Sequence, residues 1–200
     1  IKYNIEYTQK AYKLDQIEER EFPVENRLSW EDLNQYNDTI SNIRLWDYRP
    51  LQQTYSQLQS FRFYYKFKNI DVDRYQVNGQ YRQVMLSARE IDQSLLPDDT
   101  QNWINKRLSY THGYGVVASP VNGVTIEGLP NLLIKDIPLH GPSELTIDRP
   151  QIYYGEVENP FVVVNTKTKE FDYPVGSDNS YNHYQGSGGV QLNSFFKRLI

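Results

Sequence analysis

His112 is the residue whose type and setting most favour chemistry. It lies in the run YTHGYG, with glycine at positions 113 and 115. Small neighbours let a ligand or another chain segment approach the imidazole, which titrates near neutral pH. A hydrolase would also need a hydroxyl that His112 activates and a carboxylate that orients the ring. The sequence offers hydroxyls at Thr111, Ser87 and Ser119, and carboxylates at Glu90 and Asp136.

No catalytic residue is assigned beyond this candidate. The chain has no GxSxG motif, in which a strained turn exposes a nucleophilic serine. The alternative is that His112 lies at a strand edge, where its glycine neighbours allow the backbone to pack closely. We favour that alternative and lean toward a protein that is not an enzyme.

Further charged and aromatic residues form a set of ligand-binding candidates, with internal ion pairs that fix loops as the alternative use of the charges. The set is Arg89, Glu90, His112, Tyr114, Asp136, Tyr154 and Glu156. Carboxylates two positions apart could hydrolyse glycosides if about 5–9 Å separated them, but such residues share one face of a strand for ordinary structural reasons. The two pairs of this kind are Glu156 with Glu158 and Glu170 with Asp172.

Tyrosine is unusually frequent, with 17 residues. Its ring could stack on the apolar face of a sugar while nearby Asn, Gln and Asp side chains bind the hydroxyl groups. Ordinary strand packing is the alternative, because tyrosine favours pleated surfaces. The tyrosines that alternate with polar residues are Tyr110, Tyr114, Tyr153, Tyr154, Tyr173, Tyr181 and Tyr184.

Composition excludes several classes of function. The net charge is −4, with 21 basic residues dispersed among 25 acidic ones, so nucleic acid is not expected as a partner. The absence of cysteine excludes disulfides and thiolate catalysis, and it fits a protein exposed outside the cytoplasm. Oxygen ligands for calcium occur in residues 178–183, but a complete calcium loop, HExxH and GxxxxGK[ST] are all missing. We therefore predict neither a metal nor a cofactor.

Apolar spacing and capping residues predict several short helices. Pro50 suits an early position in a helix that places Leu51, Tyr55 and Leu58 on one face. Ser29 and Asp32 fit a capping box. The predicted helices span residues 4–14, 29–36, 50–59 and 97–108, and another begins near Leu192.

The strand pattern is clearest around Asn78-Gly79, a pair that favours a type I′ turn. Residues 74–77 and 80–85 alternate on either side of it, which predicts a β-hairpin. A strand is also predicted over residues 17–24. From Tyr110 onward, short apolar runs separated by Pro and Gly indicate an antiparallel or mixed sheet, with residues 176–189 as a polar loop.

Several blocks of sequence support a resemblance to a known family. They include NIRLWDYRPLQQTY, VMLSARE, YTHGYG, IKDIP and GGVQLNSFFKRL, in that order. Over nearly its whole length the chain resembles the soluble region of uncharacterised bacterial membrane proteins in the UPF (uncharacterised protein family) series. The resemblance implies membrane helices before this region, a place outside the cytoplasm, and no assigned activity.

Together these observations predict an α+β fold with a mixed, mainly antiparallel sheet, several short helices and a β-rich C-terminal half. We expect residues 1–200 to form a single soluble extracytoplasmic domain, a fragment of a longer protein of the bacterial cell membrane. Its expected role is structural or in protein interaction, and its expected partner is its own membrane-spanning region or another envelope protein. Binding of a cell-envelope glycan is the alternative, and a hydrolase centred on His112 is the third hypothesis.

Overall fold

The computed structural model describes residues 1–21 and 29–192. Contacts divide the chain into two compact units, Ile1–Asn37 and Asp38–Ile200. The single domain expected from the sequence stays a prediction, because a division by contacts does not show whether either unit folds alone.

In its described residues, the first unit contains two short α-helices and a 3₁₀ turn. They are α1 (Lys2–Ala11), η1 (Leu14–Gln16) and α2 (Trp30–Gln35). The predicted capping box is confirmed: the Ser29 hydroxyl accepts from the Asp32 amide at 3.2 Å, and the Asp32 carboxylate accepts from the Ser29 amide at 2.8 Å. The strand predicted over residues 17–24 is wrong for residues 17–21, which form no strand, and its other residues lie outside the described range.

A three-stranded antiparallel sheet and one helix form the centre of the second unit. The sheet has the order β2 (Asp71–Val77), β3 (Gln80–Ala88), β6 (Val116–Pro120). The helix is α4 (Tyr48–Gln59), which follows the short α3 (Asn37–Ile40). The hairpin between β2 and β3 is confirmed, since Asn78 and Gly79 have φ values of 52° and 71°, as a type I′ turn requires.

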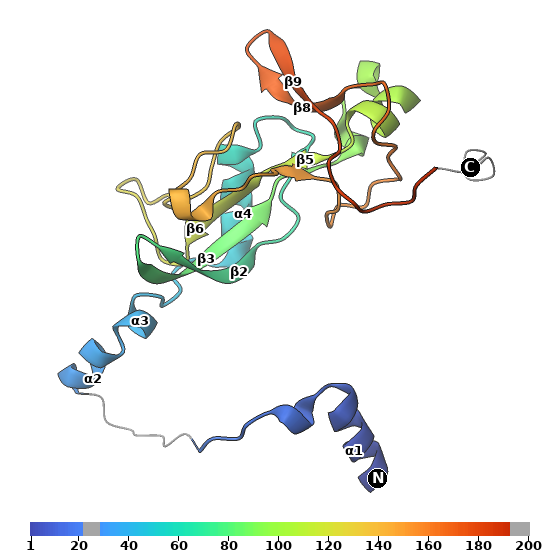
Figure 1. Cartoon of the computed structure of the whole chain (residues 1–200). Coiled ribbons are helices and arrows are strands. Elements are labelled where there is room, and N and C mark those ends of the chain that lie inside the picture. Colours follow the sequence, from blue (N-terminus) through green and yellow to red (C-terminus); the bar gives the residue numbers. More distant parts are fainter. Residues whose placement is uncertain (22–28, 193–200) are drawn as a thin grey trace. The chain divides into compact units, whose positions relative to one another are not determined.

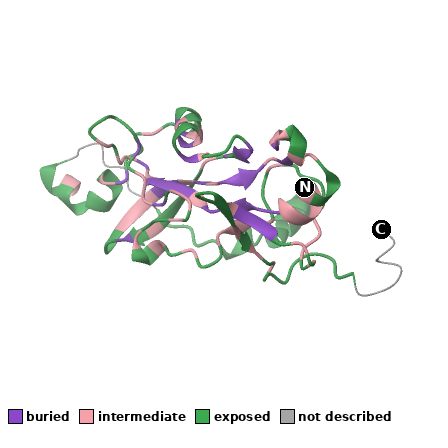
Figure 2. Ribbon diagram, turned by 90° about the horizontal axis from the view of Figure 1, so that it is seen from above, coloured by how far each residue is buried: buried purple, intermediate pink, exposed green. Residues whose placement is uncertain are grey.

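Helix α4 covers one face of this sheet, as Figure 1 shows. Leu51 and Tyr55 of α4 pack on Met85 of β3 and Val117 of β6. The opposite face is covered by loop residues around Ile134, with partly buried residues between 133 and 147. Both faces are therefore apolar, and the buried residues run along the central strands (Figure 2).

The remaining strands form three small antiparallel pairs within the described residues. They are β1 (Tyr65–Lys66) with β4 (Glu90–Ile91), β5 (Gly113–Tyr114) with β7 (Gln151–Ile152), and β8 (Glu170–Val175) with β9 (Asp178–Asn182). A second core joins the β1–β4 and β8–β9 pairs through aromatic rings, among them Tyr64, Tyr65 and Phe171. The α+β class is confirmed, and the described strands pair antiparallel throughout.

The helix predicted over residues 97–108 is wrong as a single regular element. The chain forms the 3₁₀ turns η2 (Gln93–Leu95) and η3 (Asp98–Thr100), then a π-helical turn, η4 (Asn105–Ser109). The reason is a buried side chain: the Gln93 amide donates to the carbonyls of Lys106 and Tyr110, at 2.6 and 2.9 Å. A further 3₁₀ turn is η5 (Ser143–Leu145).

The polar loop predicted over residues 176–189 is wrong for its first part. Gly176, with φ of 60°, turns the chain back so that β9 pairs with β8.

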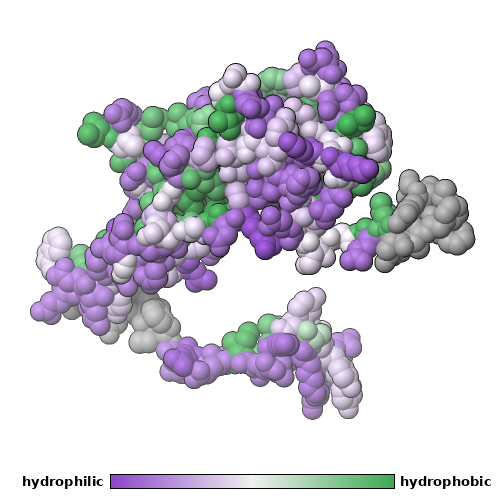
Figure 3. All heavy atoms as spheres, turned by 45° about the horizontal axis from the view of Figure 1, so that its top comes forward, coloured by the Kyte–Doolittle hydropathy of each residue, from purple (hydrophilic) through white to green (hydrophobic). Residues whose placement is uncertain are grey.

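The helix predicted to begin near Leu192 lies almost wholly outside the described residues. On the face shown in Figure 3, hydrophilic residues predominate and hydrophobic ones are scattered among them.

Candidate functional site

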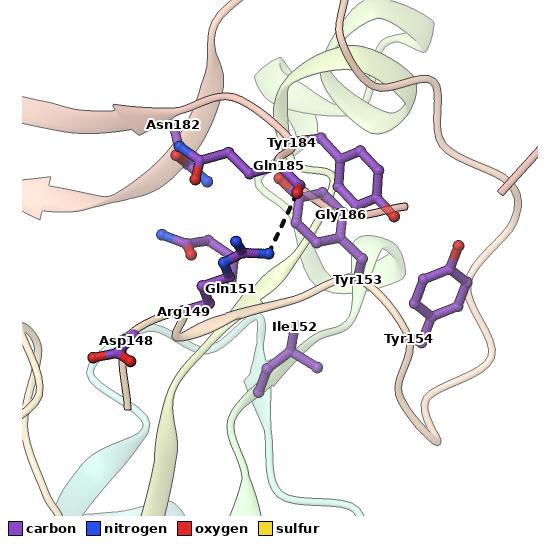
Figure 4. A pocket seen from close by; sticks show the side chains of 10 residues that line it. All are labelled: Asp148, Arg149, Gln151, Ile152, Tyr153, Tyr154, Asn182, Tyr184, Gln185 and Gly186. Carbon is purple, nitrogen blue, oxygen red and sulfur yellow. Dashed lines mark hydrogen bonds between the residues drawn. The ribbon is translucent and has the colours of Figure 1, made fainter. Parts of the chain in front are cut away.

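A pocket of about 530 Å³ lies in the second unit, where β7 and its flanking residues face the end of β9 and the loop after it. Three tyrosines and three side-chain amides form most of its wall, and one acidic and one basic residue complete the lining (Figure 4). The lining residues are Asp148, Arg149, Gln151, Ile152, Tyr153, Tyr154, Asn182, Tyr184, Gln185 and Gly186.

The aromatic part of the wall is held by close packing. Tyr153 and Tyr184 meet edge to face, with ring centroids 4.7 Å apart and an interplanar angle of 76°. A Cβ on Gly186 would lie 2.4 Å from the Tyr184 ring, and one on Gly188 would lie 2.7 Å from the Tyr154 hydroxyl. The loop after β9 can therefore pack closely against these tyrosine side chains because residues 186 and 188 are glycine. Tyr154 is 71% exposed, so much of its ring is free for a ligand.

A buried carboxylate lies beneath the wall. Glu170 is fully buried, and its Oε2 accepts from the hydroxyls of Tyr153 and Thr111, both at 2.8 Å. Its Oε1 accepts from the backbone amides of Tyr184 at 3.1 Å and Asn165 at 3.4 Å. Burial, followed by this hydrogen bond to Glu170, raises the pKa of Tyr153 well above its usual value, so its hydroxyl remains a donor.

His112 lies in the same network. Its Nε2 is 2.9 Å from Asp172 Oδ1 and its Nδ1 is 2.9 Å from the Thr111 hydroxyl. The Thr111 hydroxyl in turn donates to Glu170 Oε2 at 2.8 Å, so the imidazole lies between the carboxylates of Glu170 and Asp172.

This order of hydroxyl, imidazole and carboxylate resembles that of a nucleophilic triad, and His112 is within reach of both partners. The histidine is nevertheless 1% exposed, and Thr111 is 4% exposed. The Thr111 proton is already donated to Glu170, so the hydroxyl is not poised to attack. The groups of this network are buried and bind one another, so they are not positioned to contact a substrate.

Arg89, Tyr114 and Asp136 come together elsewhere, around Gln59. Arg89 is fully buried and donates to the carbonyls of Gln59 at 2.7 Å and Tyr114 at 2.9 Å. Asp136 fixes the Gln59 side chain through two hydrogen bonds. Its carboxylate accepts from the Gln59 side-chain amide at 3.2 Å, and its backbone N–H donates to Gln59 Oε1 at 2.6 Å. Within the described part of the chain Arg89 forms no ion pair with a carboxylate. Burial lowers the pKa of Arg89 to about 10, and none of these residues lines the tyrosine pocket.

Glu90 and Glu156 also lie away from the tyrosine pocket. Glu90 is 5% exposed and accepts from the Val157 amide at 2.8 Å, so it anchors the segment after β7. Glu156 is exposed and accepts a hydrogen bond from Asn69. Among the seven candidate ligand-binding residues, only Tyr154 lines the pocket, and His112 supports its wall through the Glu170 network.

The glycines beside His112 serve chain packing. A Cβ on Gly113 would lie 2.4 Å from the Arg89 carbonyl oxygen, and Gly115 has a φ of 72° with Leu139 packed against it. The signal that could have located the histidine's partners is the alternation of Glu170 and Asp172 on one strand. By itself this alternation favours ordinary placement on one face of a strand over a glycosidase pair, and neither interpretation identifies His112 as the partner.

Within residues 1–21 and 29–192, no group of three or more His, Asp or Glu side chains is placed to hold a metal ion. Across the same residues, no helix combines the length and apolarity needed to cross a membrane.

Comparison with known proteins extends these observations. The Uncharacterised protein family (UPF0182) matches residues 1–200. A UPF0182 protein of Pelotomaculum thermopropionicum is 55% identical over 200 residues, covering 100% of this chain and 22% of the relative. A UPF0182 protein of Methanospirillum hungatei is 50% identical over 199 residues, covering 99% of this chain and 22% of the relative. No solved structure matches.

The chain thus spans about a fifth of the length of the curated relatives that it matches. The relatives are bacterial and archaeal, a wider range than the bacterial one expected. With the match extending over all 200 residues, the chain belongs to the Uncharacterised protein family UPF0182.

Proposed function

We propose that this chain is a non-catalytic binding module on the outer side of a cell membrane, and that its ligand is a glycan of the cell envelope. The module is part of a longer, membrane-tethered protein. The observation that supports glycan binding is the tyrosine-lined pocket with amides at its rim.

The pocket has the two kinds of group that sugar recognition needs. The exposed ring of Tyr154 offers an apolar face for the C–H groups of a pyranose. Asn182 and Gln185 offer donors and acceptors to hydroxyl groups, whereas the Gln151 amide already donates to Asp172 at 3.1 Å, which leaves its carbonyl oxygen as an acceptor. Arg149 is held in place by donating to the Gln185 carbonyl at 3.3 Å. The buried Glu170 fixes the wall before a ligand arrives, which reduces the entropy lost on binding.

Titration of the 200-residue chain with soluble peptidoglycan fragments tests the proposal. Calorimetry should give saturable binding, accompanied by a change in tyrosine fluorescence. Tyr154→Ala should weaken the affinity by about twofold to thirteenfold, corresponding to the loss of one stacking contact. Because Tyr154 is exposed, the variant should unfold at the same denaturant concentration as the parent chain.

Tyr181→Ala is the matched control, because Tyr181 is an exposed tyrosine outside the pocket. It should bind the fragments as the parent chain does. Absence of saturable binding, or equal loss of affinity in both variants, would exclude the tyrosine pocket as a glycan site.

An apolar loop tip favours a second candidate, in which the module docks on the membrane-spanning region of its own protein. Val124, Ile126 and Leu129 are 43%, 103% and 41% exposed, and Ile126 lies at the turn of a short loop closed by the Thr125–Leu129 backbone hydrogen bond. A photo-crosslinker at position 126 of the full-length protein should join this loop to the membrane region of the same chain. Crosslinking to lipid alone or to solvent-exposed segments would contradict it.

A hydrolase centred on His112 has less support. Its reacting groups are buried, and the nearby hydroxyl and carboxylates already bind one another. Thr111→Val would abolish a hydrolase activity that depends on this hydroxyl, so retention of any measured activity in that variant would exclude the mechanism.

A further inference from the structure

A second cavity of about 830 Å³ lies in the second unit and shares no lining residue with the tyrosine pocket. It is formed by β1 and the residues after it, the turn η2, the start of η4 and residues 157–160. Its lining carries four cationic side chains and two acidic ones, in a chain whose net charge is −4. The cationic residues are Lys66, Lys68, Lys106 and Arg107.

These cations lack acidic partners. Within the part of the chain that the structure describes, none of the four forms an ion pair. Of the two acids in the lining, Asp92 is engaged locally, accepting from the amide and hydroxyl of Ser94 at 3.0 and 2.6 Å. With four cations and two acids, Asp92 and Glu158, the lining has a net charge of +2, which attracts an anion.

Arg107 is held in place by its surroundings. Its guanidinium lies 4.8 Å from the ring centroid of Phe161, and its Nη1 donates to Gln93 Oε1 at 3.4 Å. Gln93 is 2% exposed and is itself fixed, because its backbone amide donates to Asn159 Oδ1 at 3.1 Å. The Val163 amide donates to the Arg107 carbonyl at 2.8 Å. An arginine fixed in this way needs little further ordering to bind an anion.

One donor of this arginine has no acceptor. Arg107 Nε is buried and forms no hydrogen bond within the described residues. An unpaired buried N–H is costly, and arginine binds oxyanions in a two-pronged manner through neighbouring N–H groups. The oxygen atoms of an oxyanion are acceptors of the kind that this donor lacks.

We infer that this cavity is a binding site for a phosphate-bearing ligand, independent of the proposed glycan site. Arg107 binds the phosphate oxygens directly, and the three lysines neutralise the remaining charge. The several separate cations around one wide cavity suit a multiply charged phosphate better than a single carboxylate. Two sources share this chemistry: a soluble phosphate compound and the headgroup of an anionic phospholipid.

Calorimetric titration of the 200-residue chain with pyrophosphate tests the soluble source. Sedimentation with vesicles of phosphatidylglycerol, compared with vesicles of phosphatidylcholine, tests the lipid source. Binding in at least one arm should weaken as salt is raised, since screening reduces the attraction between exposed charges. Arg107→Gln should weaken binding about tenfold or more. Arg107→Lys keeps the positive charge but loses the paired N–H donors of the guanidinium, so its affinity should lie between those of the parent chain and Arg107→Gln.

Lys68→Gln is a second variant that should fold normally, because Lys68 is exposed. This variant should weaken binding about threefold. Lys135→Gln is the matched control: Lys135 is an exposed lysine outside the cavity, and its loss should leave binding unchanged. Tyr154→Ala should also leave phosphate binding unchanged, which separates this site from the glycan pocket. Absence of binding in both arms, or equal loss in Lys68→Gln and Lys135→Gln, would overturn the inference.

Discussion

The Tyr153 hydroxyl donates a 2.8 Å hydrogen bond to Glu170 Oε2, so a tyrosine in the pocket wall is anchored to a fully buried carboxylate. The other oxygen of Glu170 accepts from the backbone amide of Tyr184, on the facing part of the same wall. One side chain therefore fixes both sides of the aromatic pair. The pocket and the core beneath it form one structural unit.

Glu170→Gln should lower the free energy of unfolding by about 2–4 kcal/mol, as measured by urea denaturation. Both carboxylate oxygens of Glu170 accept hydrogen bonds, from Thr111 and Tyr153 on one side and from two backbone amides on the other. A glutamine would place an N–H₂ group against one of these pairs of donors. The Glu127→Gln control, at an exposed carboxylate, should change stability by less than about 0.5 kcal/mol. Equal effects in the two variants would contradict the anchoring role.

Arg89→Lys should destabilise the fold by about 2–4 kcal/mol despite keeping the charge. The guanidinium of Arg89 reaches three backbone carbonyls and the side chain of Gln59 at once. A lysine cannot span these acceptors, and its ammonium would be buried without enough partners. Thermal and urea unfolding should both report the loss, whereas Arg74→Lys, at an exposed position, should have almost no effect. A stable Arg89→Lys variant would mean that the packing around Gln59 does not depend on these hydrogen bonds.

Elements with strong local signals could be predicted from the sequence. The hairpin at Asn78-Gly79 and the capping box at Ser29 each depend on residues within a few positions of one another. The π-helical turn η4 and strand β9 could not be predicted in the same way. The first depends on the Gln93 amide, from a preceding turn, and the second is a polar strand that pairs because Gly176 reverses the chain.

The candidate site shows the same limit. His112 stood out from its neighbours in the sequence, but its partner Asp172 lies 60 positions further along the chain. Alternation placed Glu170 and Asp172 on one face of a strand without showing what that face contacts. Likewise, the sequence identified Tyr153, Tyr154 and Tyr184 as possible sugar contacts, but only the fold separates them from tyrosines such as Tyr110 that pack in the core.

Gly113→Ala should destabilise the chain by more than about 2 kcal/mol. The added Cβ would lie 2.4 Å from the Arg89 carbonyl oxygen and 2.7 Å from the Glu90 Cα, and backbone atoms cannot move aside as the end of a side chain can. Gly141→Ala is the control, because the nearest atom there is a side-chain carbon of Ile134 at 3.3 Å. Urea denaturation of the two variants should separate them clearly. Similar midpoints would show that β4 and β5 can move apart without cost.

Stability should fall as the pH rises from about 10 to about 12, and Tyr55 should account for a measurable part of that loss. Burial raises the pKa of Tyr55 from 10.0 to about 12, with the hydrogen bond to Ser119 offsetting part of the increase. Below pH 10 the tyrosine is protonated in both states, so its contribution is fully present. Between the two pKa values the unfolded chain loses the proton first, which favours unfolding by up to about 2–3 kcal/mol.

Comparison with Tyr55→Phe isolates this contribution from those of the other buried tyrosines. At neutral pH the variant should be less stable by about 1 kcal/mol, because it lacks the hydrogen bonds to Ser119 and to the Met85 carbonyl. Phenylalanine cannot ionise, so urea denaturation at increasing pH should show this difference shrinking and then reversing above pH 10. A constant difference across that range would mean that Tyr55 ionises equally readily in the folded and unfolded chain.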